Sequence, residues 1–462
     1  MIQRLFPAGL LWGELFVALE KGEIPLRRVF GFGSPALAVG SLGLPLIIFL
    51  PPLYAEMGID LALVGFLFMM VRLFDMGTDP ILGVLGDHVK SRWGRRRPIL
   101  VLSVPILLLG GLFVFNPPIG VSPTYLVLSM LLLYVGWTFF TLSHTAWASE
   151  LSGQYHQRTR ILGVVQGLGL TGALLILFVP VIYDRVADSP TIAGQASTMA
   201  WFIFVPIPFL VVFALRSVNE PAFVPPKPIG FLKSIRVLFS SFALRRVLLA
   251  DLLFGLQAGA AGSLHFFFVG QVLLMPEAAS PFLLIIFVSS VAFLPVWMKL
   301  SYHVGKHRAF CWGTLVQSIA SVLVVFLPPE QFMWSILVFV LIGVNNGAAG
   351  SLTRSMMADV IDEDHVATGQ NRGALFFSML TMTGKLGLAL AVGIAYPLLA
   401  LIGFSAGAAN DQASLDGVRY LLGGITGLAH LAIFVIMWNF PLDQKRQAEL
   451  QAELRRQEQT SG

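Results

Sequence analysis

Long apolar runs separated by short polar loops dominate the chain. A run of about twenty apolar residues is long enough to cross a bilayer as an α-helix. Six runs precede a longer polar connection at 217–246 and six follow it, which predicts an all-α polytopic membrane protein with twelve transmembrane helices. The expected helices lie near 29–52, 61–85, 98–116, 124–149, 161–183, 198–216, 247–274, 281–299, 308–327, 333–358, 374–402 and 418–440.

Six helices on each side of a long loop are typical of a transporter built from two pseudo-symmetric halves, with the substrate held between them. We therefore expect five segments. They are an N-terminal cytoplasmic or interfacial segment 1–28, a first half 29–216, a central cytoplasmic loop 217–246, a second half 247–440 and a cytoplasmic tail 441–462.

Composition agrees with a membrane protein, because 56% of the 462 residues are hydrophobic and only 12% are charged. The formal net charge of +5 would suggest nucleic acid in a soluble chain. Here the basic residues gather in loops between apolar runs, so topology accounts for them and no nucleic-acid partner is expected. The partners expected are a small-molecule substrate, a coupling cation and the lipid bilayer, with a monomer as the default state. The single cysteine, Cys311, lies in an apolar run and is interpreted as packing.

Lys and Arg concentrate in alternate loops, which places those loops on the cytoplasmic side. We expect a multi-pass protein of the inner membrane with both termini in the cytoplasm. The N-terminus does not read as a signal peptide, because Glu14 interrupts its apolar part. This N-terminal segment could form a helix on the membrane surface or a poorly ordered extension. The basic loops are 21–28, 90–97, 158–160, 216–246, 299–308, 354–372 and 445–456.

The second expected helix carries charges where they are costly. Each ionisable group near the middle of a membrane costs about 2.5–3.5 kcal/mol on insertion scales, so such groups normally face a protein interior or a cavity. Asp75 and Asp79 are four residues apart on one helix face, and Arg72 lies one turn earlier. Two carboxylates at this spacing can bind a small cation or share a proton, so Na⁺ or H⁺ coupling fits. The alternative is a buried Arg-Asp pair that only fixes helix packing.

Charged residues recur at the cytoplasmic ends of helices in both halves. Such residues can form latches that break and re-form during alternating access, although each of them could also be a solvated loop charge. The candidates for gating are Arg72, Asp87, Arg95, Arg96, Glu150, Arg158, Arg354, Asp359, Asp362 and Arg372.

Three motifs in order resemble the glycoside-pentoside-hexuronide:cation symporter family, the melibiose-permease-like branch of the major facilitator superfamily. They are RLFDMGTDPILGVLGD followed by SRWGRRRP, then ASELSGQYHQRTR, then MMADVIDEDHVATGQNRGALFFSMLTMTGKLGLAL. The resemblance implies the major facilitator fold and cation-coupled transport. It also implies a cation site formed by Asp75, Asp79, a hydroxyl of the fourth helix and Lys385 of the eleventh. Thr138 is the best match for the hydroxyl, with Thr141 as the alternative.

The charges that hold the sugar in melibiose-type members are missing from the first, fourth and fifth helices of this chain. A galactoside is therefore not expected, because sugar hydroxyls are held by charge-assisted hydrogen bonds. Polar or aromatic residues elsewhere could line the substrate cavity, or could simply form interhelical contacts. These candidates are Gln166, Asn345, Asn346, His144, Trp147 and Thr381, joined by Gln257 and His265.

The function predicted is secondary active transport, in which Na⁺ or H⁺ drives symport of a small solute. The alternative within this class is an amphipathic or lipid-like substrate. A prenyltransferase-type membrane enzyme would need a second acidic motif facing the first, and position 71 is Val where such a motif usually has Asn. We expect no enzyme activity, no cofactor and no metal beyond the coupling cation.

Overall fold

The computed structural model describes residues 24–88, 91–152, 155–220, 241–369, 372–406 and 409–461. Within them lie twelve helices long and apolar enough to cross a membrane, which confirms the predicted number. The segment 1–23 and most of the central loop, 221–240, lie outside the described residues.

The first half contains spans that are broken where proline or tight turns occur. The first span consists of α2 (Leu26–Gly33), α3 (Pro35–Gly40), a π-helical turn η3 (Pro45–Phe49) and α4 (Leu50–Glu56), and its breaks coincide with Pro35 and Pro45. The other spans are α5 (Leu61–His88), α6 (Arg96–Phe115), α7 (Pro123–Glu150), α8 (Tyr155–Leu175) with α9 (Phe178–Val186), and α10 (Ile192–Phe204) with α11 (Pro206–Ser217).

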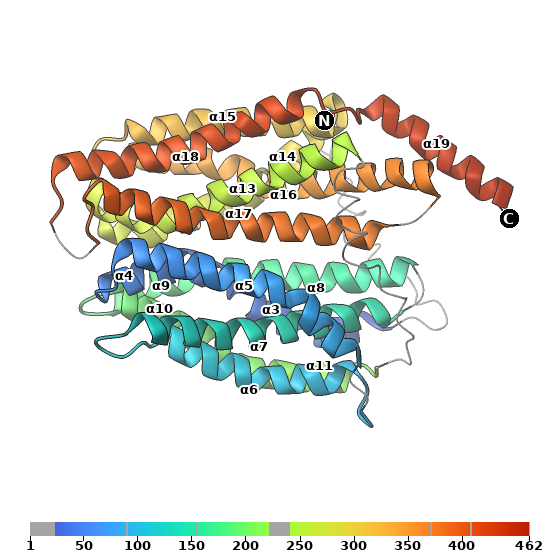
Figure 1. The fold of residues 1–462 in the computed structure, drawn as a ribbon, viewed down its shortest axis with the longest axis horizontal. Coiled ribbons are helices and arrows are strands. Elements are labelled where there is room, and N and C mark those ends of the chain that lie inside the picture. The colour runs from blue at the N-terminus through green and yellow to red at the C-terminus, as the bar shows by residue number, and fades with distance from the viewer. Residues whose placement is uncertain are drawn as a thin grey trace, which may run out of the picture.

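The second half has longer unbroken helices. They are α13 (Phe242–Phe267) with the π turn η4 (Phe268–Val272), the 3₁₀ turn η5 (Pro276–Ala278) leading into α14 (Ala279–Val304), α15 (Lys306–Val325), α16 (Phe332–Thr368), α17 (Gly373–Leu401) and α18 (Gln412–Trp438). A final helix, α19 (Gln444–Ser461), is polar and projects beyond the bundle (Figure 1).

Several helix boundaries differ by five or more residues from the expected ones, among them the start of α18 at Gln412 instead of 418 and the two described next. The tenth span continues ten residues past the expected end at 358, to Thr368, and stops at Gly369 in the left-handed conformation. Its acidic segment therefore lies within the helix, where Asp359, Asp362 and Asp364 are bonded to Lys306, Gln447 and Arg372. The sixth span begins at Ile192 instead of 198, where the Thr191 side chain accepts a hydrogen bond from the Gly194 backbone N–H and caps the helix.

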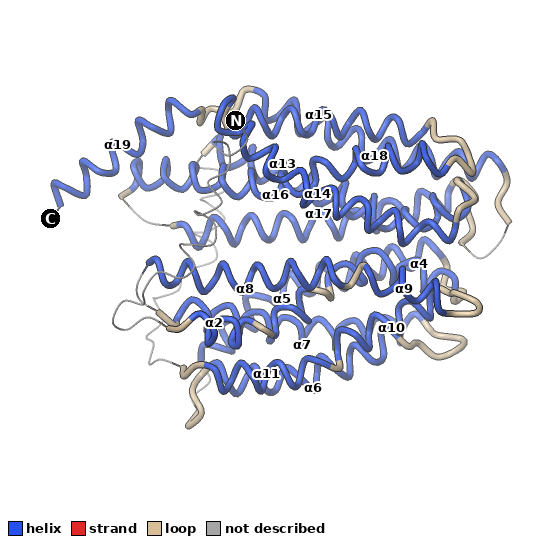
Figure 2. Tube along the Cα trace, turned by 180° about the vertical axis from the view of Figure 1, so that it is seen from behind, coloured by secondary structure: helices blue, strands red, loops and turns tan. Residues whose placement is uncertain are grey.

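The helices form two bundles lying side by side, α2–α11 and α13–α18, as Figures 1 and 2 show. Helices α5 and α17 face one another across the boundary. Their backbones approach closely at Gly65, where an added Cβ would lie 2.7 Å from the carbonyl oxygen of Val392. Small residues allow such close packing of membrane helices. The outer faces expose large apolar side chains, as a lipid-facing surface does, including Phe209 and Leu428.

Candidate functional site

A cluster of polar groups lies where α5, α7 and α17 meet. Asp75 and Asp79 lie one turn apart on α5 and point to the same side, toward Thr138 of α7. The Thr138 hydroxyl oxygen is 3.0 Å from Oδ1 of Asp75 and 2.9 Å from Oδ1 of Asp79. A single hydroxyl hydrogen can serve only one of these carboxylates at a time. Three oxygen atoms therefore converge on a small region, as hard cations prefer.

Lys385 of α17 reaches the same carboxylates from the other half. Its ammonium donates to Oδ2 of Asp75 at 3.3 Å and to Oδ2 of Asp79. The Asp75 side chain is 4% exposed, whereas those of Asp79 and Lys385 are about one quarter exposed. Part of the cluster is therefore left uncovered by the protein, while its deepest acid is enclosed.

The charges of this cluster do not cancel. Two carboxylates and one ammonium give −2 + 1 = −1 in formal charge. One monovalent cation or one proton would neutralise these three directly bonded groups, and Arg72 is a further positive charge within electrostatic reach of Asp75. Buried charge is costly unless it is compensated, so the cluster is chemically suited to exchange a single positive charge.

Arg72, the third charge on α5, does not pair with these acids among the described residues. Its guanidinium donates to the Tyr134 hydroxyl at 2.7 Å and stacks over the rings of Tyr134 and Trp137 at 5.2 and 5.8 Å. The Arg-Asp packing pair, which was the alternative interpretation of α5, is not formed between its described residues. No sequence pattern indicated Tyr134 as the partner of Arg72.

The predicted latch residues of the first half form a buried ion-pair network. Oε1 of Glu150, at the end of α7, accepts from Arg95 at 2.7 Å and from Arg96 at 2.8 Å, at the start of α6. The carboxylate of Glu220, which sequence analysis missed, accepts from the backbone N–H groups of Arg95, Arg96 and Arg97. It thereby caps the N-terminus of α6. Asp87 and Arg158, also expected to take part, lie outside the described side chains.

A related pair occurs at the corresponding place in the second half. The Lys306 ammonium, at the start of α15, lies 2.7 Å from Asp359 Oδ1 on α16. Lys306 was not among the predicted latch residues, although its loop is basic like the loop before α6. In both halves the described pairs join neighbouring helices of the same bundle.

The remaining gating candidates, Arg372, Asp362 and Arg354, have different surroundings. Arg372 pairs with Asp364 across the α16–α17 turn. Asp362 accepts from Gln447 and Gln451, which attaches α19 to α16. The side chain of Arg354 is exposed.

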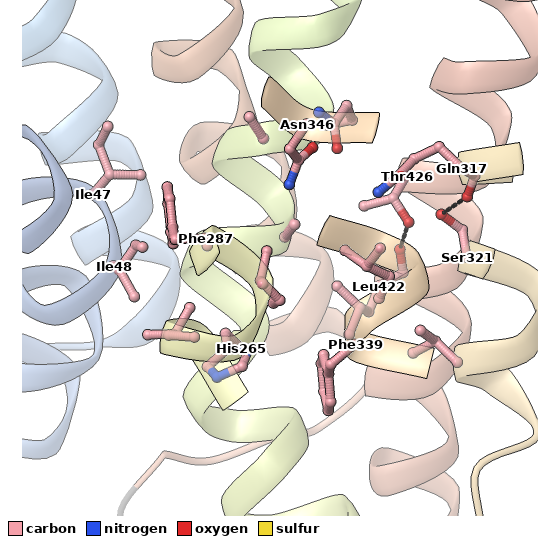
Figure 3. A pocket seen from close by; sticks show the side chains of 18 of the residues that line it. Ile47, Ile48, His265, Phe287, Gln317, Ser321, Phe339, Asn346, Leu422 and Thr426 are labelled. Carbon is pink, nitrogen blue, oxygen red and sulfur yellow. Dashed lines mark hydrogen bonds between the residues drawn. The ribbon is translucent and has the colours of Figure 1, made fainter. Parts of the chain in front are cut away.

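A cavity of about 330 Å³ lies within the second half and is closed on one side by the first span (Figure 3). Three of the polar candidates line it, namely Gln257, His265 and Asn346, and Gln317, which sequence analysis missed, joins them. The only signal for Gln317 was an amide within an apolar run. No Asp, Glu, Lys or Arg side chain is among the described residues that line the cavity.

The remaining cavity candidates do not line this cavity. His144 is buried, stacks on Phe32 and hydrogen-bonds to the Phe32 carbonyl at 2.9 Å. Trp147 is fully buried beneath the guanidinium of Arg97. Asn345 is buried beside Gly313. Gln166 and Thr381 are exposed, and Thr381 donates to its own helix.

Residues 31–444 match the family described as MFS/sugar transport protein. Among curated relatives, the glucuronide carrier protein homolog of Escherichia coli (strain K12) is 22% identical over 428 residues, covering 91% of this chain and 92% of the relative. The sodium-dependent lysophosphatidylcholine symporter 1-A of Danio rerio is 23% identical, covering 84% and 81%. The crystal structure of a D-xylose-proton symporter superposes with a TM-score of 0.63 at 14% identity, covering 91% of this chain and 96% of that one, and shows the same fold. Because the family match spans most of the sequence, this chain belongs to the MFS/sugar transport protein family.

Proposed function

We propose that this protein is a cation-coupled secondary transporter that uses Asp75 and Asp79 to bind Na⁺ or H⁺ while it moves a small solute by alternating access. The observation that carries this proposal is the position of the acid pair. The carboxylates belong to the first half, and their ammonium partner, Lys385, belongs to the second.

This arrangement gives coupling a physical basis. A cation entering among Asp75, Asp79 and the Thr138 hydroxyl competes with Lys385 for the negative charge of the same two carboxylates, although Thr138 contacts their Oδ1 atoms and Lys385 their Oδ2 atoms. Displacing the ammonium weakens a contact between the halves, so cation binding changes their relative stability. A substrate that favours the same state then raises cation affinity, and the cation raises substrate affinity by the same factor.

The names of several relatives support the proposal that this protein transports a small solute. They include a glucuronide carrier homolog, an isoprimeverose transporter and a glycoside/cation symporter, which are described as carriers of sugars or of their derivatives. Transport of an amphipathic lipid is the alternative, for which the lysophosphatidylcholine symporter is a precedent, but the glycoside and glucuronide carriers among the relatives do not favour it. The basic loops support a location in the inner membrane, with both termini in the cytoplasm.

The test is thermal unfolding of the purified full-length protein in Na⁺, with K⁺ at equal ionic strength as reference. A ligand that binds only the folded state raises the melting temperature (Tm) by mass action. We expect Na⁺ or low pH to raise Tm in wild type and not in Asp75→Asn or Asp79→Asn. Asp188→Asn, an exposed loop acid, is the matched control and should respond like wild type.

Proteoliposomes then distinguish the two ions, because uptake of radiolabelled methyl glycosides should follow an imposed Na⁺ gradient or a pH gradient. The proposal fails if both Asn variants keep the wild-type cation and pH responses. It also fails if uptake is independent of both gradients.

A further inference from the structure

An acid that the proposed mechanism does not use lies inside a membrane span of the second half. Asp251 is on α13, about two and a half turns after the helix begins at Phe242, and its side chain is partly buried. An ionisable side chain in such a position is costly, so it normally marks a functional position. Sequence analysis did not single it out.

Asp251 is bonded to α17, the helix that carries Lys385. The Thr383 hydroxyl is 2.9 Å from Asp251 Oδ2 and also 2.9 Å from the Leu380 carbonyl of its own helix. Its single hydrogen serves one acceptor at a time, and a carboxylate is the stronger acceptor. The same Oδ2 lies against the helix backbone, since a Cβ added to Gly384 would be 3.1 Å away. The carboxylate therefore holds α17 directly before Lys385.

Arg354 of α16 supplies positive charge near this carboxylate. Its side chain is exposed, and it lies within electrostatic reach of Asp251. Opposite charges compensate one another, which lowers the cost of a carboxylate inside a membrane span. A charged acceptor also forms a stronger hydrogen bond than a neutral one, so Arg354 supports the bond between Asp251 and Thr383.

Thr383 and Lys385 point to opposite sides of α17. Residues two apart on an α-helix are separated by about 200°, so Thr383 faces α13 whereas Lys385 faces α5. At this level α17 is bonded to acids on both sides, to Asp251 of its own half and to Asp75 and Asp79 of the other. The first bond lies within one bundle, and the second crosses the boundary between the bundles.

Adhesion between α13 and α17 does not require an acid, because glycines already bring the helices together. A Cβ added to Gly255 would lie 2.6 Å from the Gly384 carbonyl oxygen, and one added to Gly387 would overlap the Leu252 carbonyl oxygen. Close backbone contact of this kind is a common means of association between membrane helices. What Asp251 adds is a directional bond, which fixes the position of α17 along and around its axis.

We infer that Asp251 is a positioning residue for Lys385. Through Thr383 it holds α17 so that the Lys385 ammonium stays on Asp75 and Asp79, and it thereby sets how strongly that ammonium competes with the coupling cation. The inference rests on the proposed function, since it concerns the cation site of that transporter.

The test measures the apparent cation affinity of the purified full-length protein, from Tm against Na⁺ concentration and, separately, against pH. Thr383→Val removes the hydroxyl at nearly constant shape, and Asp251→Leu removes its acceptor from the other helix. A less firmly placed ammonium competes less well, so each variant should bind the cation at least about threefold more tightly than wild type. Thr383→Ser keeps the hydroxyl and should behave like wild type.

Double variants with Lys385→Met separate positioning from a structural role. If Asp251 acts through Lys385, Thr383→Val and Asp251→Leu should leave the cation affinity of Lys385→Met unchanged, even where they lower its Tm. A role in packing alone would lower Tm in both backgrounds without changing cation affinity. Thr314→Val is the matched control and should keep the wild-type affinity, because this buried hydroxyl of α15 donates to the Cys311 carbonyl of its own helix.

The inference is overturned if either Thr383→Val or Asp251→Leu, once folded, binds the cation no more tightly than wild type. It is also overturned if these variants change cation affinity equally with and without Lys385, because Asp251 would then act independently of the ammonium. Absence of any cation response in wild type would instead contradict the proposed function.

Discussion

Lys385 and Asp79 are 306 residues apart in the sequence, yet the ammonium of one donates directly to the carboxylate of the other. The pair joins α17 of the second half to α5 of the first. The acids that we propose to bind the cation are therefore bonded across the boundary between the two halves of the transporter.

Replacing Lys385 by Met should change how strongly the protein depends on cations. The variant keeps Asp75 and Asp79 but loses their ammonium, so the cluster carries a formal charge of −2 and its carboxylates repel. We expect a lower Tm in the absence of Na⁺ and at high pH, and a larger rise in Tm on adding Na⁺ or acid than in wild type. Lys299→Met, at an exposed position on α14, is the control. Equal cation responses in Lys385→Met and wild type would show that the ammonium does not compete with the cation.

The Thr138 hydroxyl should contribute directly to cation affinity. Thr138→Val removes the hydroxyl at constant shape, and we expect the apparent cation affinity to fall by about tenfold. Thr138→Ser should retain most of it. Affinity is measured from Tm against cation concentration.

Thr141 provides a matched control for this hydroxyl, because it donates to the Trp137 carbonyl of its own helix. Thr141→Val should leave cation affinity unchanged. If Thr141→Val lost more cation affinity than Thr138→Val, the hydroxyl at the cation site would be that of Thr141, one turn further along α7.

The ion pairs of Glu150 in the first half and of Asp359 in the second half should contribute differently to the free energy of unfolding. Glu150 is 3% exposed and pairs with two arginines, so Glu150→Gln leaves buried positive charge and should cost about 3–5 kcal/mol. Lys306 is 39% exposed, so water can replace Asp359 as its partner, and Asp359→Asn should cost less than about 1 kcal/mol. The ranking is measured as loss of Tm, with the exposed Glu453→Gln as reference. An equal or reversed ranking would contradict the burial argument.

Close packing of α5 on α17 should require a glycine at 65. Gly65→Ala places a Cβ 2.7 Å from both the Val392 carbonyl oxygen and the Tyr396 Cβ, so the helices must separate and Tm should fall. Gly77→Ala on the same helix meets nothing within 4 Å and should be neutral or stabilising by about 0.5–1 kcal/mol. Both are compared in thermal unfolding, and a destabilised Gly77→Ala with an unaffected Gly65→Ala would place the critical contact elsewhere on α5.

The sequence alone predicted the helices well, because the bilayer leaves little choice. A backbone in hydrocarbon must satisfy its own hydrogen bonds, so each apolar run of sufficient length becomes a helix. For the same reason Asp75 and Asp79 were recognisable as functional candidates, since the spacing of four residues places them on one face and their charge excludes contact with lipid. Helix ends were less accurate, as Thr368 shows, because polar residues remain helical after the membrane ends.

The three-dimensional structure was needed to show which residues meet between helices. Periodicity assigns a side chain to a face of its helix, but the neighbour of that face depends on how all the helices pack. Glu150 therefore contacts Arg95 and Arg96 of the preceding span, and Gln257 and Gln317, sixty positions apart, line one cavity. Local sequence determined the helices and the acid pair, whereas packing summed over many side chains decided the partners of the acids and the residues that line the second-half cavity.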